Sequence, residues 1–247
     1  MKNKVLKLLL LLVTIKSFGQ DSIVEKKCHS QIFSLSPISK KVDKVNGLVF
    51  GVGHVDNKNI LNQTINGINI EANPAPAVGS LLVFMIVMHL PEICKNNKKN
   101  IPNDSTKVME TNLKIENWTK KPNLKINGLN ISTGCFFTTT SMNGINLSLG
   151  NKFVNFNGLS IAPLGTISDK QNGVSIGLIN ASNLLNGASI GLYNQSYKLN
   201  GLQFGVYNQV KTNSGLQIGI FNKSNSKGFQ IGFWNKNNSR SFPILNC

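Results

Sequence analysis

The sequence predicts an all-β fold, a repeat β-solenoid with about 14 residues per coil. Three observations carry this prediction. One phrase recurs at a nearly constant period, apolar residues occupy every second position within it, and an Asn-Gly pair opens most copies. Alternation with a period of two is typical of strands, and Asn-Gly is typical of tight turns.

The period is set by the glycine that opens each phrase. From Gly128 to Gly228 these glycines are 16, 14, 15, 14, 14, 14 and 13 residues apart. One unit buries about four apolar side chains, which contributes roughly 1.5–3 kcal/mol each. Ordering its backbone costs roughly 1–2 kcal/mol per residue, so a lone unit cannot fold and the units must stack.

Each phrase supplies one short strand with two chemically different faces. Leu202, Phe204 and Val206 alternate with Gln203, Gly205 and Tyr207. Because apolar side chains normally face the core, we predict an inward row and an outward row. The inward row is Leu202, Phe204, Val206, Leu216, Ile218 and Ile220, and the outward row contains Gln203 and Gln217.

A second Asn closes the best phrases and distinguishes the possible architectures. In a solenoid, Asn194, Asn208 and Asn222 occupy equivalent corners, one strand spacing of ~4.8 Å apart, where their amides can form ladders. In the alternative, an antiparallel β-meander or outer-membrane β-barrel, they alternate between opposite ends of the sheet. The apolar stretches are shorter than the ~9–11 residues of a spanning strand, which favours the solenoid.

The chain divides into a leader, a short segment and one long repeat domain. Residues 1–20 have three lysines followed by an apolar run from Leu8 to Ile15, which predicts a secretory signal peptide. Residues 21–45 form an N-terminal segment, and 46–247 form a single β-repeat domain with an irregular insertion at about 74–125. The expected location is the periplasm, the outer membrane or the cell surface.

Cysteine usage and charge leave several interpretations open. Cys28, Cys94, Cys135 and Cys247 allow three disulfide connectivities, and free thiols are an equal alternative. The formal net charge is +16, which favours anionic envelope polymers or lipid headgroups. The positive charges are scattered lysines with a single Arg and no nucleic-acid motif, so no nucleic-acid partner is expected.

The sequence contains no catalytic, metal or cofactor constellation. After Asp169 there is no Asp or Glu, so that part of the chain cannot supply paired carboxylates for acid–base chemistry or a calcium site. His29, His54 and His89 are isolated from one another. We therefore expect no enzyme activity, no cofactor and no metal.

One candidate surface emerges from the glycines at the strand centres. Gly205, Gly219 and Gly232 weaken strands and so require a reason. One hypothesis is a shallow outer groove that binds sugars or an extended peptide. Its walls are Gln203 and Gln217 on one side and Tyr207, Phe221 and Trp234 on the other. The alternative is that glycine relieves crowding between coils.

The phrases GLQFGVYN, GLQIGIFN and GFQIGFWN, with the ending NNSRSFPILN, resemble bacterial surface-repeat proteins built from GLQIGLxN units. The resemblance covers 172–247 well and 126–171 more loosely, and it implies an envelope or surface location without a specific activity. Cys247 stands where an aromatic residue is common in that family.

We thus expect a non-enzymatic protein with a structural or adhesive role. Its expected partner is envelope polysaccharide or another surface protein, and membrane association remains open. The rival hypothesis is a small outer-membrane barrel with a transport or scaffold role.

Overall fold

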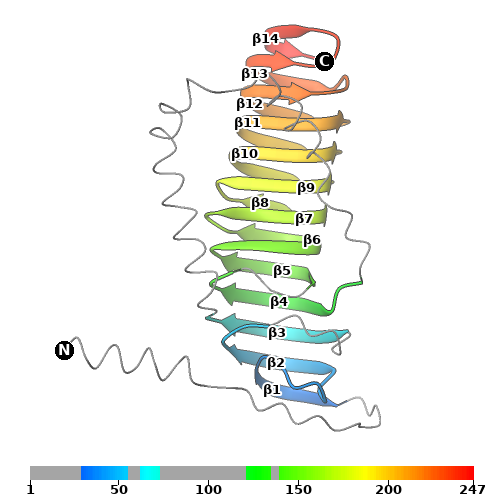
Figure 1. Ribbon diagram of the computed structural model, residues 1–247. Helices are drawn as coiled ribbons and strands as arrows, with labels where there is room; N and C mark the ends of the chain where they lie inside the picture. The colour runs from blue at the N-terminus through cyan, green and yellow to red at the C-terminus, as the bar shows by residue number, and fades with distance from the viewer. Residues whose placement is uncertain (1–28, 55–61, 73–120, 135–138) are drawn as a thin grey trace, which may run out of the picture.

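The computed structural model describes residues 29–54, 62–72, 121–134 and 139–247, and these form a β-solenoid whose coils stack along one axis (Figure 1). The stack runs from the blue N-terminal strands to the red C-terminal strands. Its strands are β1 (Ser30–Ser36), β2 (Lys44–Gly51), β3 (Gln63–Glu71), β4 (Leu124–Ser132), β5 (Thr140–Ser148), β6 (Gly150–Ile161), β7 (Gly165–Gln171), β8 (Val174–Ile176), β9 (Ile179–Leu185), β10 (Ala188–Leu199), β11 (Leu202–Asn213), β12 (Leu216–Ser224), β13 (Phe229–Lys236) and β14 (Ser241–Asn246).

Neighbouring strands pair in parallel from β1 to β13, in the order of the chain, with β8 bridging β6 and β10. Only the last pair, β13 with β14, is antiparallel. The predicted solenoid is confirmed. The antiparallel alternatives, the meander and the barrel, are wrong because each strand pairs with its counterpart one coil later in the same direction.

The stack begins earlier than the sequence suggested and passes over the irregular segment. Strand β1 starts at Ser30, inside the segment predicted to precede the repeat domain, and pairs with β2. Strand β3 pairs directly with β4 over nine residues. The predicted signal peptide, Cys28, Cys94, Cys135, His89 and most of the insertion lie outside the described residues.

The Asn residues that close the phrases form a buried ladder, as predicted. The side-chain Nδ2 of Asn194 donates to Oδ1 of Asn208 at 2.9 Å, and Nδ2 of Asn208 donates to Oδ1 of Asn222 at 2.8 Å. Each Nδ2 also donates to a carbonyl of the next coil, as Asn208 does to Ile218 O at 2.9 Å. Asn180 and Asn235 extend the ladder at its two ends. Both N–H groups of each inner amide are therefore used.

A second ladder runs along the outside at the Asn-Gly corners. Asn143 donates to Asn127 at 2.7 Å, and Asn200 donates to Asn186 at 2.9 Å. The same bond joins the other members of the column, which are Asn46, Asn66, Asn157 and Asn172. Each corner requires a glycine because the neighbouring coil lies very close to it. At Gly128, φ is 134°, and a Cβ there would overlap the carbonyl oxygen of the preceding coil.

The predicted inside and outside rows are reversed, and this part of the prediction was wrong. Gln203 and Gln217 are fully buried, whereas Phe204 is 51% exposed and Ile220 is 47% exposed. Val206 is also exposed, and Leu202, Leu216 and Ile218 are half-buried. The narrow interior admits the glutamines because their amides stack. Gln217 donates to Gln203 at 2.9 Å, and Gln230 donates to Gln217 at 2.8 Å.

The composition of the interior changes along the stack. In the N-terminal half an apolar cluster fills it: Ile38, Val42, Val45, Val49, Ile65, Leu124, Ile126, Met142, Phe153 and Phe156. In the C-terminal half only Leu185, Leu199 and Val210 form such a cluster, and amides and hydroxyls occupy the rest. Strand β14 closes this polar end. Asn246 donates to Gln230 at 3.1 Å, and Arg240 holds Asn246 through Nε at 2.9 Å.

The two Asn ladders differ in burial. Removing one Asn side chain from each should therefore lower the free energy of unfolding by different amounts. Replacing Asn208 by Ala removes three hydrogen bonds and leaves buried partners unpaired, which should lower the free energy of unfolding by about 3 kcal/mol. Asn200→Ala on the exposed ladder is the matched control and should cost less than about 1 kcal/mol, because water replaces the lost partner. Urea unfolding monitored by circular dichroism measures both, and equal costs would contradict the assignment of the inner ladder as the stabilising one.

Candidate interaction surface

The five residues predicted to form a binding surface are split between the interior and the outside. Gln203 and Gln217 are buried in the amide ladder and cannot wall an outer groove. Tyr207 is half-buried, and Phe221 and Trp234 are exposed. The structure therefore keeps the aromatic half of the predicted surface and removes the amide half.

The central glycines point toward the interior, where the Asn ladder lies. A Cβ on Gly219 would overlap the carbonyl oxygen of Gly205 and come within 2.5 Å of Nδ2 of Asn208. Gly205 and Gly232 are in the same situation with the Asn residues of their own preceding coils. Crowding between coils thus explains this glycine column, and the hypothesis of an outer groove is wrong.

A continuous apolar surface replaces the groove on the outside of the solenoid. Strand register places two columns of apolar side chains along it. The first column is Leu48, Ile68, Leu129, Ile145, Leu159, Val174, Ala188, Leu202, Leu216 and Phe229. The second is Phe50, Ile70, Ile131, Leu147, Ile161, Ile176, Ile190, Phe204, Ile218 and Ile231. No position in either column is polar or charged.

A third apolar column widens this surface in the C-terminal half. It consists of Leu178, Leu192, Val206, Ile220 and Phe233, all of them exposed, and Phe233 reaches 74%. We call the three columns together the apolar face. Strand spacings of ~4.8 Å make it about 43 Å long, and residue spacings of ~3.3 Å make it about 13 Å wide where all three columns are present and about 7 Å wide elsewhere. The area is on the order of 400 Å² in flat projection, within the range of the largest patches on ordinary monomers, which are often functional.

Aromatic side chains border one edge of the apolar face. Tyr193, Tyr207, Phe221 and Trp234 are in register on successive coils. The rings of Tyr193 and Tyr207 stack with centroids 5.5 Å apart and an angle of 6° between their planes. The hydroxyl of Tyr193 donates to Oε1 of Gln195 at 3.1 Å and lies 3.3 Å from Oε1 of Gln209. The polar tips of the tyrosines therefore point away from the apolar face.

Burial raises the pKa of Tyr193 above its ordinary value of 10.0, and the neighbouring Tyr207 raises it further. Burial also raises the pKa of Tyr207. Both rings consequently stay neutral throughout the physiological range and present an uncharged border between apolar and polar surface.

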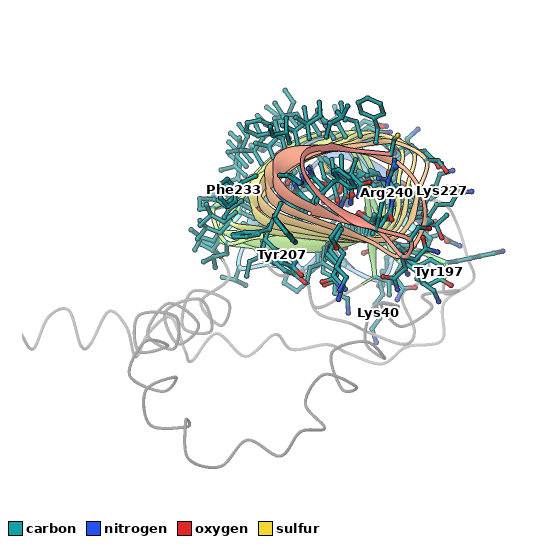
Figure 2. All side chains as sticks on the ribbon, turned by 90° about the horizontal axis from the view of Figure 1, so that it is seen from above. Lys40, Tyr197, Tyr207, Lys227, Phe233 and Arg240 are labelled. Atoms are coloured by element: carbon teal, nitrogen blue, oxygen red, sulfur yellow. The ribbon has the colours of Figure 1, made fainter. Side chains whose placement is uncertain are left out.

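The side of the coil opposite the apolar face is polar and basic. Viewed along the stack, Phe233 lies on one side, and Tyr197 and Lys227 lie on the other (Figure 2). Lys211 contacts the Tyr197 ring there, with Nζ 4.7 Å from its centroid. The described residues include thirteen Lys and Arg but only Asp43, Glu71 and Asp169 as acids. Each coil is thus amphipathic around its circumference.

The structure also brings together three polar residues that the sequence did not identify as a group. His54 Nδ1 contacts the Glu71 carboxylate, and Ser36 Oγ donates to Glu71 at 3.1 Å. All three side chains are buried. Only the register of β1 to β3 reveals this cluster, because the residues are far apart in sequence. Its burial and its place at a coil end suit a structural hydrogen-bonded cluster better than a reactive centre.

Within the described ranges, no three His, Cys, Asp or Glu side chains lie close enough together to hold a metal ion. Nor does this part of the chain contain a helix long and apolar enough to cross a membrane. Cys247 is a free, exposed thiol. Comparison of the chain with protein-family models, with curated proteins and with solved structures finds no match.

The glycine column provides a direct test of interior crowding. Gly219→Ala should lower the free energy of unfolding by more than about 2 kcal/mol, because the added methyl group meets backbone and a buried amide. Gly150→Ala is the matched control, since its Cβ would come no closer than 3.3 Å to a side-chain atom and should change stability by less than about 1 kcal/mol. A Gly219→Ala protein as stable as the wild type would show that there is open space beside this column, and it would contradict the crowding explanation.

The tyrosine pair predicts a loss of stability in alkali. A raised folded-state pKa means that the folded protein favours the neutral phenol. This contribution is fully present below pH 10 and is lost as the pH rises through the higher pKa of the folded state. The melting temperature of the wild type should therefore fall more steeply between pH 9.5 and 11, a range of about 1.5 units around the ordinary tyrosine pKa, than that of Tyr193→Phe/Tyr207→Phe. Parallel curves for the two proteins would contradict the prediction, since lysine titration is common to both.

Proposed function

We propose that the protein is an exported, non-enzymatic repeat protein of the bacterial envelope or surface, with a structural or adhesive role exerted through its apolar face. The observation that carries the proposal is the length of that face. It contains no polar or charged position in its two full columns across ten successive coils. A surface of this kind is costly in water and is typical of interaction sites.

The magnitude of the apolar effect supports binding rather than a free rod. Covering about 400 Å² of apolar surface contributes on the order of 10 kcal/mol. Association costs about 4–15 kcal/mol in lost freedom of motion, so binding requires contact along most of the face. Because inner and outer ladders tie every coil to the next, the face is held as one rigid strip and can bind along its whole length.

The chemistry of the described residues supports a role without catalysis. The three carboxylates are separated along the stack, and the only buried acid–base contact, His54 with Glu71, lies inside the coil. Export is supported by the leader-like composition of residues 1–20. The resemblance to surface-repeat proteins points to the same location.

Cell fractionation of two variants with matched substitutions to lysine tests the proposal. Phe204→Lys/Ile220→Lys places two charges on the apolar face, and Thr212→Lys/Asn225→Lys places two on exposed positions of the opposite side. Both proteins should fold, because no ladder residue is changed. The envelope-bound share should fall several-fold for the first variant and stay near wild type for the second.

Two outcomes would contradict the proposal. Equal retention of both variants would show that the apolar face does not hold the protein in the envelope. A wild-type protein found in the cytosolic fraction with residues 1–20 still attached would show that the chain is not exported.

A further inference from the structure

We propose that the apolar face binds the surface of an anionic lipid bilayer, with the solenoid axis lying parallel to the membrane plane. This inference rests on the proposed function, because both require an exported protein with a free apolar face. It goes further by naming the occupant of that face. Three independent features of the described residues point to lipid.

The order of side chains around each coil matches the order of chemistry across a membrane interface. In the coil of β11, Phe204 and Val206 are apolar, Tyr207 follows, and Gln209 comes next. In the coil of β13, Phe233 is followed by Trp234 and then by Lys236. Acyl chains take apolar groups, the interface takes Tyr and Trp, and the headgroup layer takes amides and lysines.

The aromatic border is oriented as such an interface requires. The Tyr193 hydroxyl bonds to Gln195, so its polar tip points to the amide and lysine side while its ring stacks on the ring of Tyr207. The column of Gln195 and Gln209 continues as Lys223 and Lys236. Two lysines therefore lie directly beside the aromatic border, at the level where lipid phosphates would be.

The other edge of the face is also suited to the headgroup layer. The exposed Asn ladder borders the first apolar column, with Asn200 two residues before Leu202 and Asn186 two residues before Ala188. These amides are uncharged and already paired with one another, so they can lie among headgroups without the desolvation cost of an unpaired charge. The Asn ladder therefore borders the apolar face from β2 to β11, the aromatic residues border its other edge from β10 to β13, and both borders are present at the coils of β10 and β11.

Charge decides between a bilayer and a second copy of the chain. The described residues carry thirteen basic against three acidic side chains, and no acid follows Asp169. Two copies of a chain with this excess of positive charge repel one another, which disfavours association. An anionic bilayer attracts the same lysines.

Vesicle flotation with the purified exported protein tests the inference. The probes are vesicles of pure phosphatidylcholine and vesicles that contain about 30% phosphatidylglycerol, whose negative surface potential attracts basic segments. The wild type should float with the anionic vesicles. Phe204→Gln/Phe233→Gln should lower the vesicle affinity at least ~10-fold, because burial of apolar area carries the binding. The matched control Thr212→Gln/Asn225→Gln should change it less than ~2-fold, since these exposed residues lie off the face.

A spectroscopic measurement adds the position of the border. The chain has two tryptophans, so Trp118→Phe leaves Trp234 as the single fluorophore. Its emission should move to shorter wavelength with anionic vesicles, and lipids brominated in the upper acyl chain should quench it.

Lys223→Gln/Lys236→Gln should weaken binding to anionic vesicles several-fold and leave the weaker binding to neutral vesicles unchanged.

Several results would overturn the inference. One is a wild type that does not float, and another is a Phe204→Gln/Phe233→Gln variant that floats as well as the wild type. A protein that sediments as a dimer, is made monomeric by the same pair of substitutions and ignores vesicles would identify a second copy as the occupant. Vesicle binding gained only after deletion of residues 75–119 would identify that segment as the occupant. Envelope retention in cells without any vesicle binding would sink the lipid assignment alone and leave the proposed function standing.

Discussion

An amide buried inside a narrow β-coil must find its hydrogen-bond partners within the protein, and an identical amide directly above or below it can supply them. In this protein Asn208 meets that condition through Asn194, Asn222 and a carbonyl of the next coil. The condition forces parallel stacking with identical register in every coil. It also excludes slippage by one residue, because a shift would orphan every amide of the ladder at once. The regularity of the stack follows from this constraint.

The same constraint determines where the apolar residues go. Gln203, Gln217 and Gln230 occupy the interior side of their strands. Since successive residues of a strand point to opposite sides, filling the interior with amides sends Leu, Ile, Val and Phe outward. The apolar face is therefore a geometric consequence of the polar interior. In the N-terminal half the inner positions are apolar as well, so the outer columns add to a conventional core there.

The last parallel coil of the stack is covered by a strand that runs in the opposite direction. An endless parallel ladder would expose unpaired strand groups at its last coil, which is a site for aggregation. Strand β14 covers that coil in the antiparallel direction, and Asn246 takes the place of the next Gln in the ladder. Pro243 removes one donor from the new edge. The ending that resembles surface-repeat proteins thus acts here as a cap.

The sequence alone determined the period, the strand character of each phrase, the corners at Asn-Gly and the stacking of Asn194, Asn208 and Asn222. Each of these follows from local chemistry repeated at a fixed interval. Tertiary structure alone decided which side of each strand is inside. Alternation with a period of two shows that a strand has two different faces, but it does not show which face points to the interior. The usual rule that apolar residues face inward failed for Phe204 and Gln203. It takes no account of the bonds that a buried Gln makes to its copies in neighbouring coils. Those bonds exist only once the coils are stacked. The aromatic border was identifiable in the sequence, but its position beside a continuous apolar face was not.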